Sequence, residues 1–152
     1  MKPLLFIGLG NPLMGDEGIG WHVAELLAAD PRLPETVEVV CGGTDLLRHA
    51  GRMEGRTRVV VADAIQGDGE VGSVSIFQDA LPGLDDHQEH AHHLSAVQAI
   101  GLLRMVARVP FTLLGISISS AAVGNGLSPA LAARAPAISE RVLRALTGNS
   151  GE

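Results

Sequence analysis

Continuous apolar runs constrain the fold of this 152-residue chain more than any other feature. Three of them, residues 4–9, 58–64 and 111–117, have apolar side chains at successive positions rather than at every second one. A strand loses that alternation only when both of its faces are buried, which is typical of parallel sheets covered on both sides by helices. The runs therefore predict the buried centre of a parallel sheet.

The segments between these runs have helical spacing or the marks of edge strands. Residues 36–41 predict a further strand and the alternating residues 72–78 an edge strand. Helices are expected over residues 19–29, 44–51, 94–106 and 128–146, the last with Ser128 as its N-cap. This order predicts an α/β fold, a three-layer α/β/α sandwich with a mostly parallel, roughly five-stranded twisted sheet. We expect a single domain over residues 1–152, with 148–152 as a frayed tail.

Composition excludes several classes of function. The formal net charge is −6, the 11 Lys and Arg residues form no basic run, and aromatic residues make up only 3%. Neither a nucleic-acid surface nor an anionic membrane surface is expected of such a chain. No apolar stretch is long enough to span a bilayer. The single cysteine, Cys41, rules out an internal disulfide and fits a cytoplasmic location.

The glycine-rich turn after the first strand does not fit a nucleotide site. Gly8-Leu9-Gly10 begins like a dinucleotide-binding turn, but Leu13 stands where the third glycine belongs. Asp16 and Glu17 follow, and two acids at a helix start would repel a pyrophosphate. The turn therefore has to serve another chemistry.

Two acids and a histidine fall at the predicted carboxyl edge of the sheet, where ligands bind in open α/β folds. Glu17 follows the first strand, Asp63 ends the valine-rich strand, and His92 opens the third helix. Two carboxylates and an imidazole suit a divalent ion such as Ni²⁺, Zn²⁺, Co²⁺ or Fe²⁺. Each residue also has an ordinary structural reading, as a helix-terminal acid, a capping Asp or a member of a solvated polar loop.

A covalent nucleophile is the competing hypothesis. Cys41 lies near a strand end and is either such a nucleophile or, more simply, a small buried residue. No G-x-S-x-G elbow occurs in the sequence.

Taken together, these segments resemble the hydrogenase maturation endopeptidases, the nickel-dependent processing proteases of [NiFe]-hydrogenases. The matching pieces follow the family's order and extend over most of the chain: GLGNPLMGDEGIG (8–20), GGTDLL (42–47), VVVADA (59–64), HHLS (92–95) and GNGLSP (124–129). The resemblance places catalytic and metal-binding roles on Glu17, Asp63 and His92. The histidine of the family is followed three positions later by Gly or Ser, and Ser95 stands three positions after His92. His92 is therefore chosen, and the adjacent His93 is the alternative. Asp16 and Asn11 are expected to support the ligands.

The resemblance implies a cytoplasmic, aspartic-type endopeptidase within the phosphorylase/hydrolase-like variety of the fold. Its partner would be the large-subunit precursor of a [NiFe]-hydrogenase, from which it removes a C-terminal extension after nickel insertion. The Ni²⁺ would come from that substrate, and water would attack one peptide bond with help from the metal or a carboxylate.

The sequence departs from the family pattern in two regions, and two other functions compete with this hypothesis. Ser117 stands where many members have an acid or amide, and the His-rich stretch 85–93 is either a mobile recognition loop or a solvated one. A nickel-binding maturation chaperone would have the same ligands without proteolysis. Peptidyl-tRNA hydrolase shares the Gly-Leu-Gly-Asn-Pro opening, but it requires a basic face that this acidic chain lacks.

Overall fold

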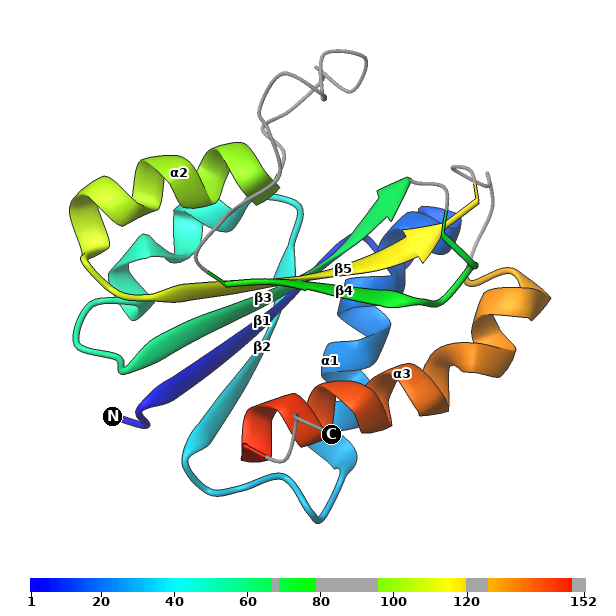
Figure 1. The fold of residues 1–152 in the computed structure, drawn as a ribbon, viewed down its shortest axis with the longest axis horizontal. Helices are drawn as coiled ribbons and strands as arrows, with labels where there is room; N and C mark the ends of the chain where they lie inside the picture. Colours follow the sequence, from blue (N-terminus) through cyan, green and yellow to red (C-terminus); the bar gives the residue numbers. More distant parts are fainter. Residues whose placement is uncertain (67–68, 79–95, 120–125, 149–152) are drawn as a thin grey trace.

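The computed structural model describes residues 1–66, 69–78, 96–119 and 126–148 (Figure 1). These residues form a central sheet with helices on both faces. The expected three-layer α/β/α architecture is therefore confirmed.

The sheet has five strands in the order β2-β1-β3-β5-β4. β1, β2, β3 and β5 are parallel, whereas β4 runs antiparallel to β5. β4 is an edge strand, as the alternating pattern predicted. The strands are β1 (Leu4–Leu9), β2 (Val37–Gly43), β3 (Arg58–Gln66), β4 (Val74–Phe77) and β5 (Phe111–Ile118). All eight residues of β5 are buried, which explains its continuous apolar sequence.

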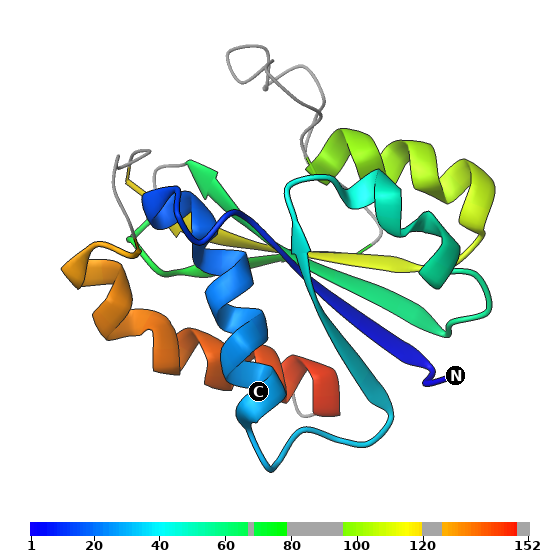
Figure 2. The ribbon, with the colours of Figure 1, turned by 180° about the vertical axis from the view of Figure 1, so that it is seen from behind.

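Helices cover the two faces of the sheet unequally. α1 (Ile19–Ala29) and α3 (Pro129–Thr147) pack side by side on one face, and α2 (Ala96–Ala107) lies on the other with the 3-10 helix η2 (Leu46–Arg52) (Figures 1 and 2). Each layer encloses its own apolar cluster, one centred on Phe6, Val23 and Ile138 and the other on Ile7, Met53 and Ile100. The sheet therefore separates two cores.

Several element boundaries differ from the sequence expectation. The second strand continues to Gly43 rather than Cys41, and the short helix expected over residues 44–51 is a 3-10 helix with Asp45 at its N-cap. The final helix begins as predicted, because the Ser128 hydroxyl accepts a hydrogen bond from the N–H of Leu131. It ends at Gly148, whose φ of 84° is left-handed. The remaining tail, residues 149–152, and the polar loop expected over residues 79–91 lie outside the described residues.

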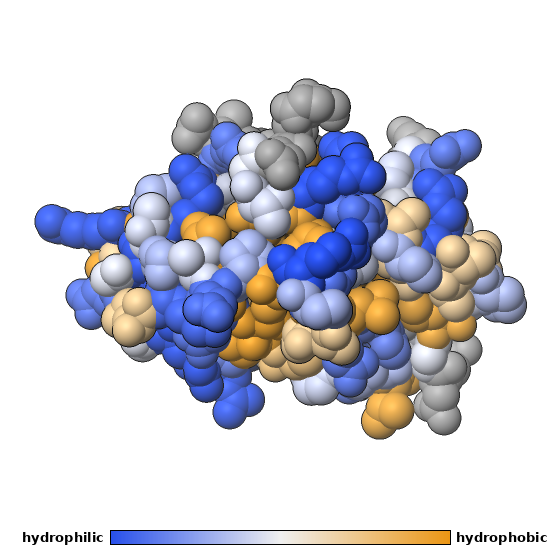
Figure 3. Space-filling model, turned by 90° about the horizontal axis from the view of Figure 1, so that it is seen from below, coloured by the Kyte–Doolittle hydropathy of each residue, from blue (hydrophilic) through white to orange (hydrophobic). Residues whose placement is uncertain are grey.

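The surface mixes polar and apolar groups. On the underside of the molecule, apolar side chains gather near the middle and hydrophilic ones surround them (Figure 3). Among the described residues, none of the helices has the length and hydropathy needed to cross a bilayer.

Candidate functional site

The candidate site begins where β3 extends beyond its neighbour β1. β1 pairs with β3 only as far as Gly8 opposite Ala62, whereas β3 continues to Gln66 alongside β5. Asp63 is therefore the first residue of β3 without β1 beside it. The expectation that Asp63 ends its strand is wrong by three residues, because β5 supplies backbone partners as far as Gln66.

A 3-10 helix, η1 (Gly15–Gly18), packs against this part of β3 and includes Glu17. The chain returns on itself so closely here that only glycine fits. A Cβ on Gly10 would lie 2.5 Å from the main-chain oxygen of Glu17, and a Cβ on Gly18 would lie 2.5 Å from that of Asn11. The glycines of the turn therefore hold the backbone of Glu17 against the end of β1.

The carboxylate of Asp16, the residue before Glu17, is hydrogen-bonded to Ser128. It is buried, and its two carboxylate oxygens accept hydrogen bonds from the backbone N–H of Ser128 at 2.7 Å and from its hydroxyl at 2.9 Å. Asp16 thereby joins η1 to the start of α3. Sequence reasoning singled out both residues but missed their pairing, since 112 positions separate them.

Asn11 stabilises the turn itself. Its side-chain oxygen accepts a hydrogen bond from the N–H of Leu13 at 2.9 Å, and its main-chain oxygen accepts one from Met14. Loops that close on themselves through an Asn side chain in this way are typical Asx turns. The expected supporting roles of Asn11 and Asp16 toward a metal remain predictions.

Burial is the main cause that raises the pKa of Asp63, a hydrogen bond from the N–H of Ala64 lowers it, and the negative charge of Glu17 adds a smaller rise, so that the pKa lies at about 7. That hydrogen bond, at 2.8 Å, holds one carboxylate oxygen in place. Glu17 lies on η1, which packs against β3, and its charge acts on Asp63, so the two predicted acids lie near one another at this edge of the sheet although 46 positions separate them in the chain. Two neighbouring carboxyl groups, both on half-buried residues, favour a shared proton or a bound cation.

The predicted histidine ligand stays untested. His92, its alternative His93 and the rest of the stretch 85–93 lie outside the described residues. Within the part of the chain that is described, no cluster of three or more His, Cys, Asp and Glu side chains could hold a metal ion. The structure thus brings together two of the three proposed ligands.

The two other singled-out residues have local structural partners. Cys41 is half-buried in β2, its thiol faces the main-chain oxygen of Trp21 at 3.9 Å, and burial raises its pKa, which disfavours the reactive thiolate. Ser117 is buried in β5 and accepts a hydrogen bond from the Ser73 hydroxyl at 3.2 Å. The Ser117 hydroxyl is therefore bound within the fold.

Fold and site together define an α/β protein with an acidic pair at the carboxyl edge of a parallel sheet. Residues 21–145 match the family model described as hydrogenase maturation protease (HycI). The chain belongs to the hydrogenase maturation proteases, a family of peptidases. This membership sets aside both rivals, the chaperone without proteolysis and peptidyl-tRNA hydrolase.

Individual relatives agree with this assignment. The hydrogenase 2 maturation protease of Escherichia coli (strain K12) is 33% identical over 147 residues, which cover 94% of this chain and 90% of that protein. The E. coli hydrogenase maturating endopeptidase HybD superposes with a TM-score of 0.73 at 28% identity, covering 99% of this chain and 94% of its own. The Thermococcus kodakarensis KOD1 protease HycI has a TM-score of 0.76 at 24% identity over 96% and 93% of the two chains, which shows a shared fold.

Proposed function

We propose that this protease removes a C-terminal extension from the large-subunit precursor of a [NiFe]-hydrogenase after nickel has been inserted. The observation that carries the proposal is the placement of Glu17 on η1 and Asp63 on β3, two elements that pack against each other at the carboxyl edge of the sheet. Family membership supports the choice of a hydrogenase precursor as substrate.

The acidic pair has the chemistry needed to recognise a metal ion in the substrate. Carboxylate oxygens together with an imidazole, here His92 or its alternative His93, suit a divalent ion such as Ni²⁺. A cation beside Asp63 would favour the charged form of its carboxyl group and so offset the cost of burying it. The nickel of the precursor is thus both the feature recognised and the partner that completes the site.

Cleavage in this proposal is a hydrolysis without a covalent enzyme intermediate. Water adds to the carbonyl carbon of one peptide bond, a carboxylate of the acidic pair accepts its proton, and the bond to nitrogen breaks as the departing amine is protonated. The half-buried Cys41 thiol, with its raised pKa, is poorly suited to act as a nucleophile. A cytoplasmic location belongs to the same proposal and is supported by the single cysteine.

Mass spectrometry of the precursor tests the proposal. The chain is incubated with nickel-loaded precursor and, in parallel, with precursor that lacks nickel. Loss of a C-terminal peptide from the nickel-loaded sample alone is expected. Processing of both samples would contradict nickel-dependent recognition, and an unchanged mass in both would contradict the proposed cleavage.

Variants then test the three ligands. Glu17→Gln, Asp63→Asn and His92→Ala are expected to stop processing while thermal unfolding remains cooperative. Glu35→Gln is the matched control, because Glu35 is exposed and lies just before the start of β2, at the amino edge of the sheet. If His93→Ala stops processing and His92→Ala does not, the ligand is His93.

A further inference from the structure

The outer face of α2 is unusually apolar for a surface helix. Leu102, Met105 and Val106 are 49%, 79% and 70% exposed, and their spacing of three and four residues places them on one side of the helix. The opposite side of α2 is buried against the sheet through residues such as Ile100 and Leu103. A helix with one face in the core normally has polar residues on the other, so this second apolar face indicates contact with another molecule.

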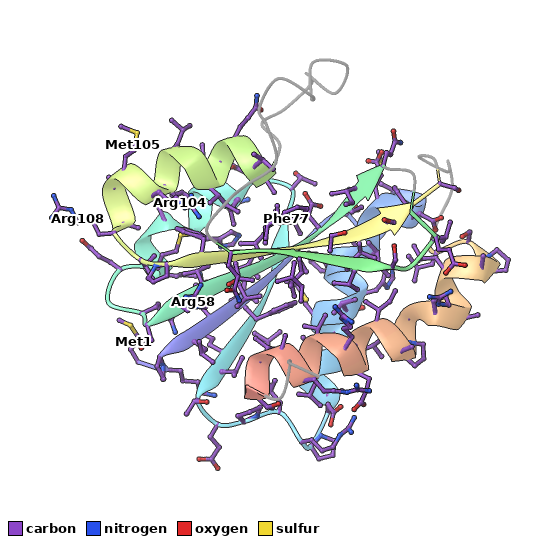
Figure 4. All side chains as sticks on the ribbon, viewed as in Figure 1. Met1, Arg58, Phe77, Arg104, Met105 and Arg108 are labelled. Carbon is purple, nitrogen blue, oxygen red and sulfur yellow. The ribbon has the colours of Figure 1, made fainter. Side chains whose placement is uncertain are left out.

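Two arginines lie near the C-terminal end of α2, Arg104 on the side that faces the sheet and Arg108 just beyond the end of the helix. Arg104 lies between the helix and the sheet and donates to the main-chain oxygen of Gln78 at 2.9 Å, while Arg108 points away from the fold (Figure 4). In the part of the chain that is described, the ion pairs to carboxylates involve other arginines, namely Arg32, Arg52, Arg56 and Arg144. Both guanidinium groups are therefore free of an acidic partner there, on a chain whose net charge is −6.

The backbone at Arg108 also points to a role for its side chain. Arg108 has a φ of 55°, in the left-handed region where glycine or asparagine is favoured after a helix. Beneath it, the two arginines line a cavity of about 450 Å³ with Gln78, Val109, Pro110 and Phe111. An arginine held in an unfavourable conformation beside an open cavity suits the binding of a carboxylate.

We propose that this area, the α2 docking surface (Leu102, Arg104, Met105, Val106 and Arg108), binds an acidic segment with apolar side chains on the body of the hydrogenase precursor. The exposed methionine and its aliphatic neighbours accommodate the apolar groups, and the arginines pair with the acids. The proposal rests on the proposed function, because it takes the precursor as the partner.

The position of α2 decides what size of partner could contact both this helix and the acidic pair. α2 begins at Ala96, soon after the proposed ligand His92, and its 12 residues span about 18 Å toward the opposite edge of the sheet (Figure 1). A stable interface covers roughly 800 Å² of each partner, an area about 28 Å across. The proposal therefore requires a partner that contacts the acidic pair and α2 at once, which suits a folded protein rather than a short peptide.

Steady-state kinetics on nickel-loaded precursor test the docking surface. Met105→Asp and Arg108→Glu alter exposed side chains and are expected to raise KM at least about tenfold, with kcat within about twofold of the wild type. Arg141→Glu and Ala133→Asp make the same changes of charge on exposed positions of α3, in the opposite layer, and are expected to leave both constants unchanged. Thermal unfolding of each variant verifies that it is folded.

Direct binding and oligomeric state separate failure of this proposal from failure of the proposed function. An unchanged KM in both α2 variants, while the wild type processes the precursor, would overturn the docking surface alone. If the wild type fails to cleave but binds the precursor at least about tenfold more tightly than the α2 variants do, the docking surface stands and the cleavage proposal falls. Sedimentation that shows a wild-type dimer dissociated by these substitutions would assign the surface to a second copy and overturn the proposal.

Discussion

Replacing Asp63 by asparagine is expected to stabilise the folded chain at neutral and alkaline pH while removing the proposed activity. Asparagine keeps the shape of the side chain and the oxygen that accepts the hydrogen bond from Ala64. It removes the charge that burial and Glu17 both oppose. The substitution therefore separates the stability of the site from its chemistry.

The sign and size follow from the raised pKa of Asp63. The folded chain keeps the proton up to a pKa of about 7, whereas the unfolded chain releases it near 3.8, so the free energy of unfolding falls as pH rises between these values. At ~1.4 kcal/mol per pH unit, the difference between these two pKa values sets an upper limit of ~4 kcal/mol on the stability that the ionisation of Asp63 removes. Because the side chain is only half-buried, we expect Asp63→Asn to gain about 1–2 kcal/mol at pH 8.

Urea unfolding at pH 8 and at pH 4.5, in buffers with a chelator, measures this gain. At pH 4.5 the folded wild type has a protonated Asp63, so the gain is expected to shrink to less than about a third of its value at pH 8. Asp45→Asn, at an exposed position, is expected to change stability by less than about 0.5 kcal/mol at either pH. A gain that is absent at pH 8, or equal at the two pH values, would refute the reasoning.

Three further substitutions and one control test the framework of the fold by chemical denaturation. Ser128→Ala removes the N-cap of α3 and a hydroxyl bound to a buried carboxylate, and a loss of about 1–3 kcal/mol is expected. Gly20→Ala would place a Cβ against main-chain oxygens of β1 and β3 and is expected to cost about 2 kcal/mol or more, whereas Gly101→Ala, with nothing within 4 Å, is expected to be neutral or stabilising. Glu38→Gln should cost at most about 1 kcal/mol at pH 7 and less at pH 3, because the hydrogen bond from Arg56 lowers the pKa of Glu38 and the stabilisation is lost as pH falls through that lowered pKa. An undiminished cost of Glu38→Gln at pH 3, or a Gly20→Ala chain as stable as the wild type, would contradict these assignments.

The layers and the order of elements could be predicted because their causes are local. A run such as Leu4–Leu9 shows its burial on both faces directly in its composition. The rule that sites form at the carboxyl edge of a parallel sheet then pointed to Glu17 and Asp63, which the structure brings together.

The remaining details depend on contacts between distant parts of the chain. The length of β3 past Asp63 is decided by its pairing with β5, and the hydrogen bonds between Asp16 and Ser128 cross 112 positions. No periodicity in the sequence encodes such pairings. The choice between an α-helix and a 3-10 helix at residues 15–18 likewise depends on how tightly the segment packs.

The close backbone approaches at Gly10 and Gly18 have a consequence for how this stretch can change in evolution. These glycines are required by the space between main-chain atoms, whatever the neighbouring side chains do. A descendant with amides in place of Glu17 and Asp63 would keep the turn and the fold while giving up the proposed chemistry. The glycine pattern by itself thus marks an architecture, and under the proposed mechanism the two acids would distinguish a working protease from an inactive copy.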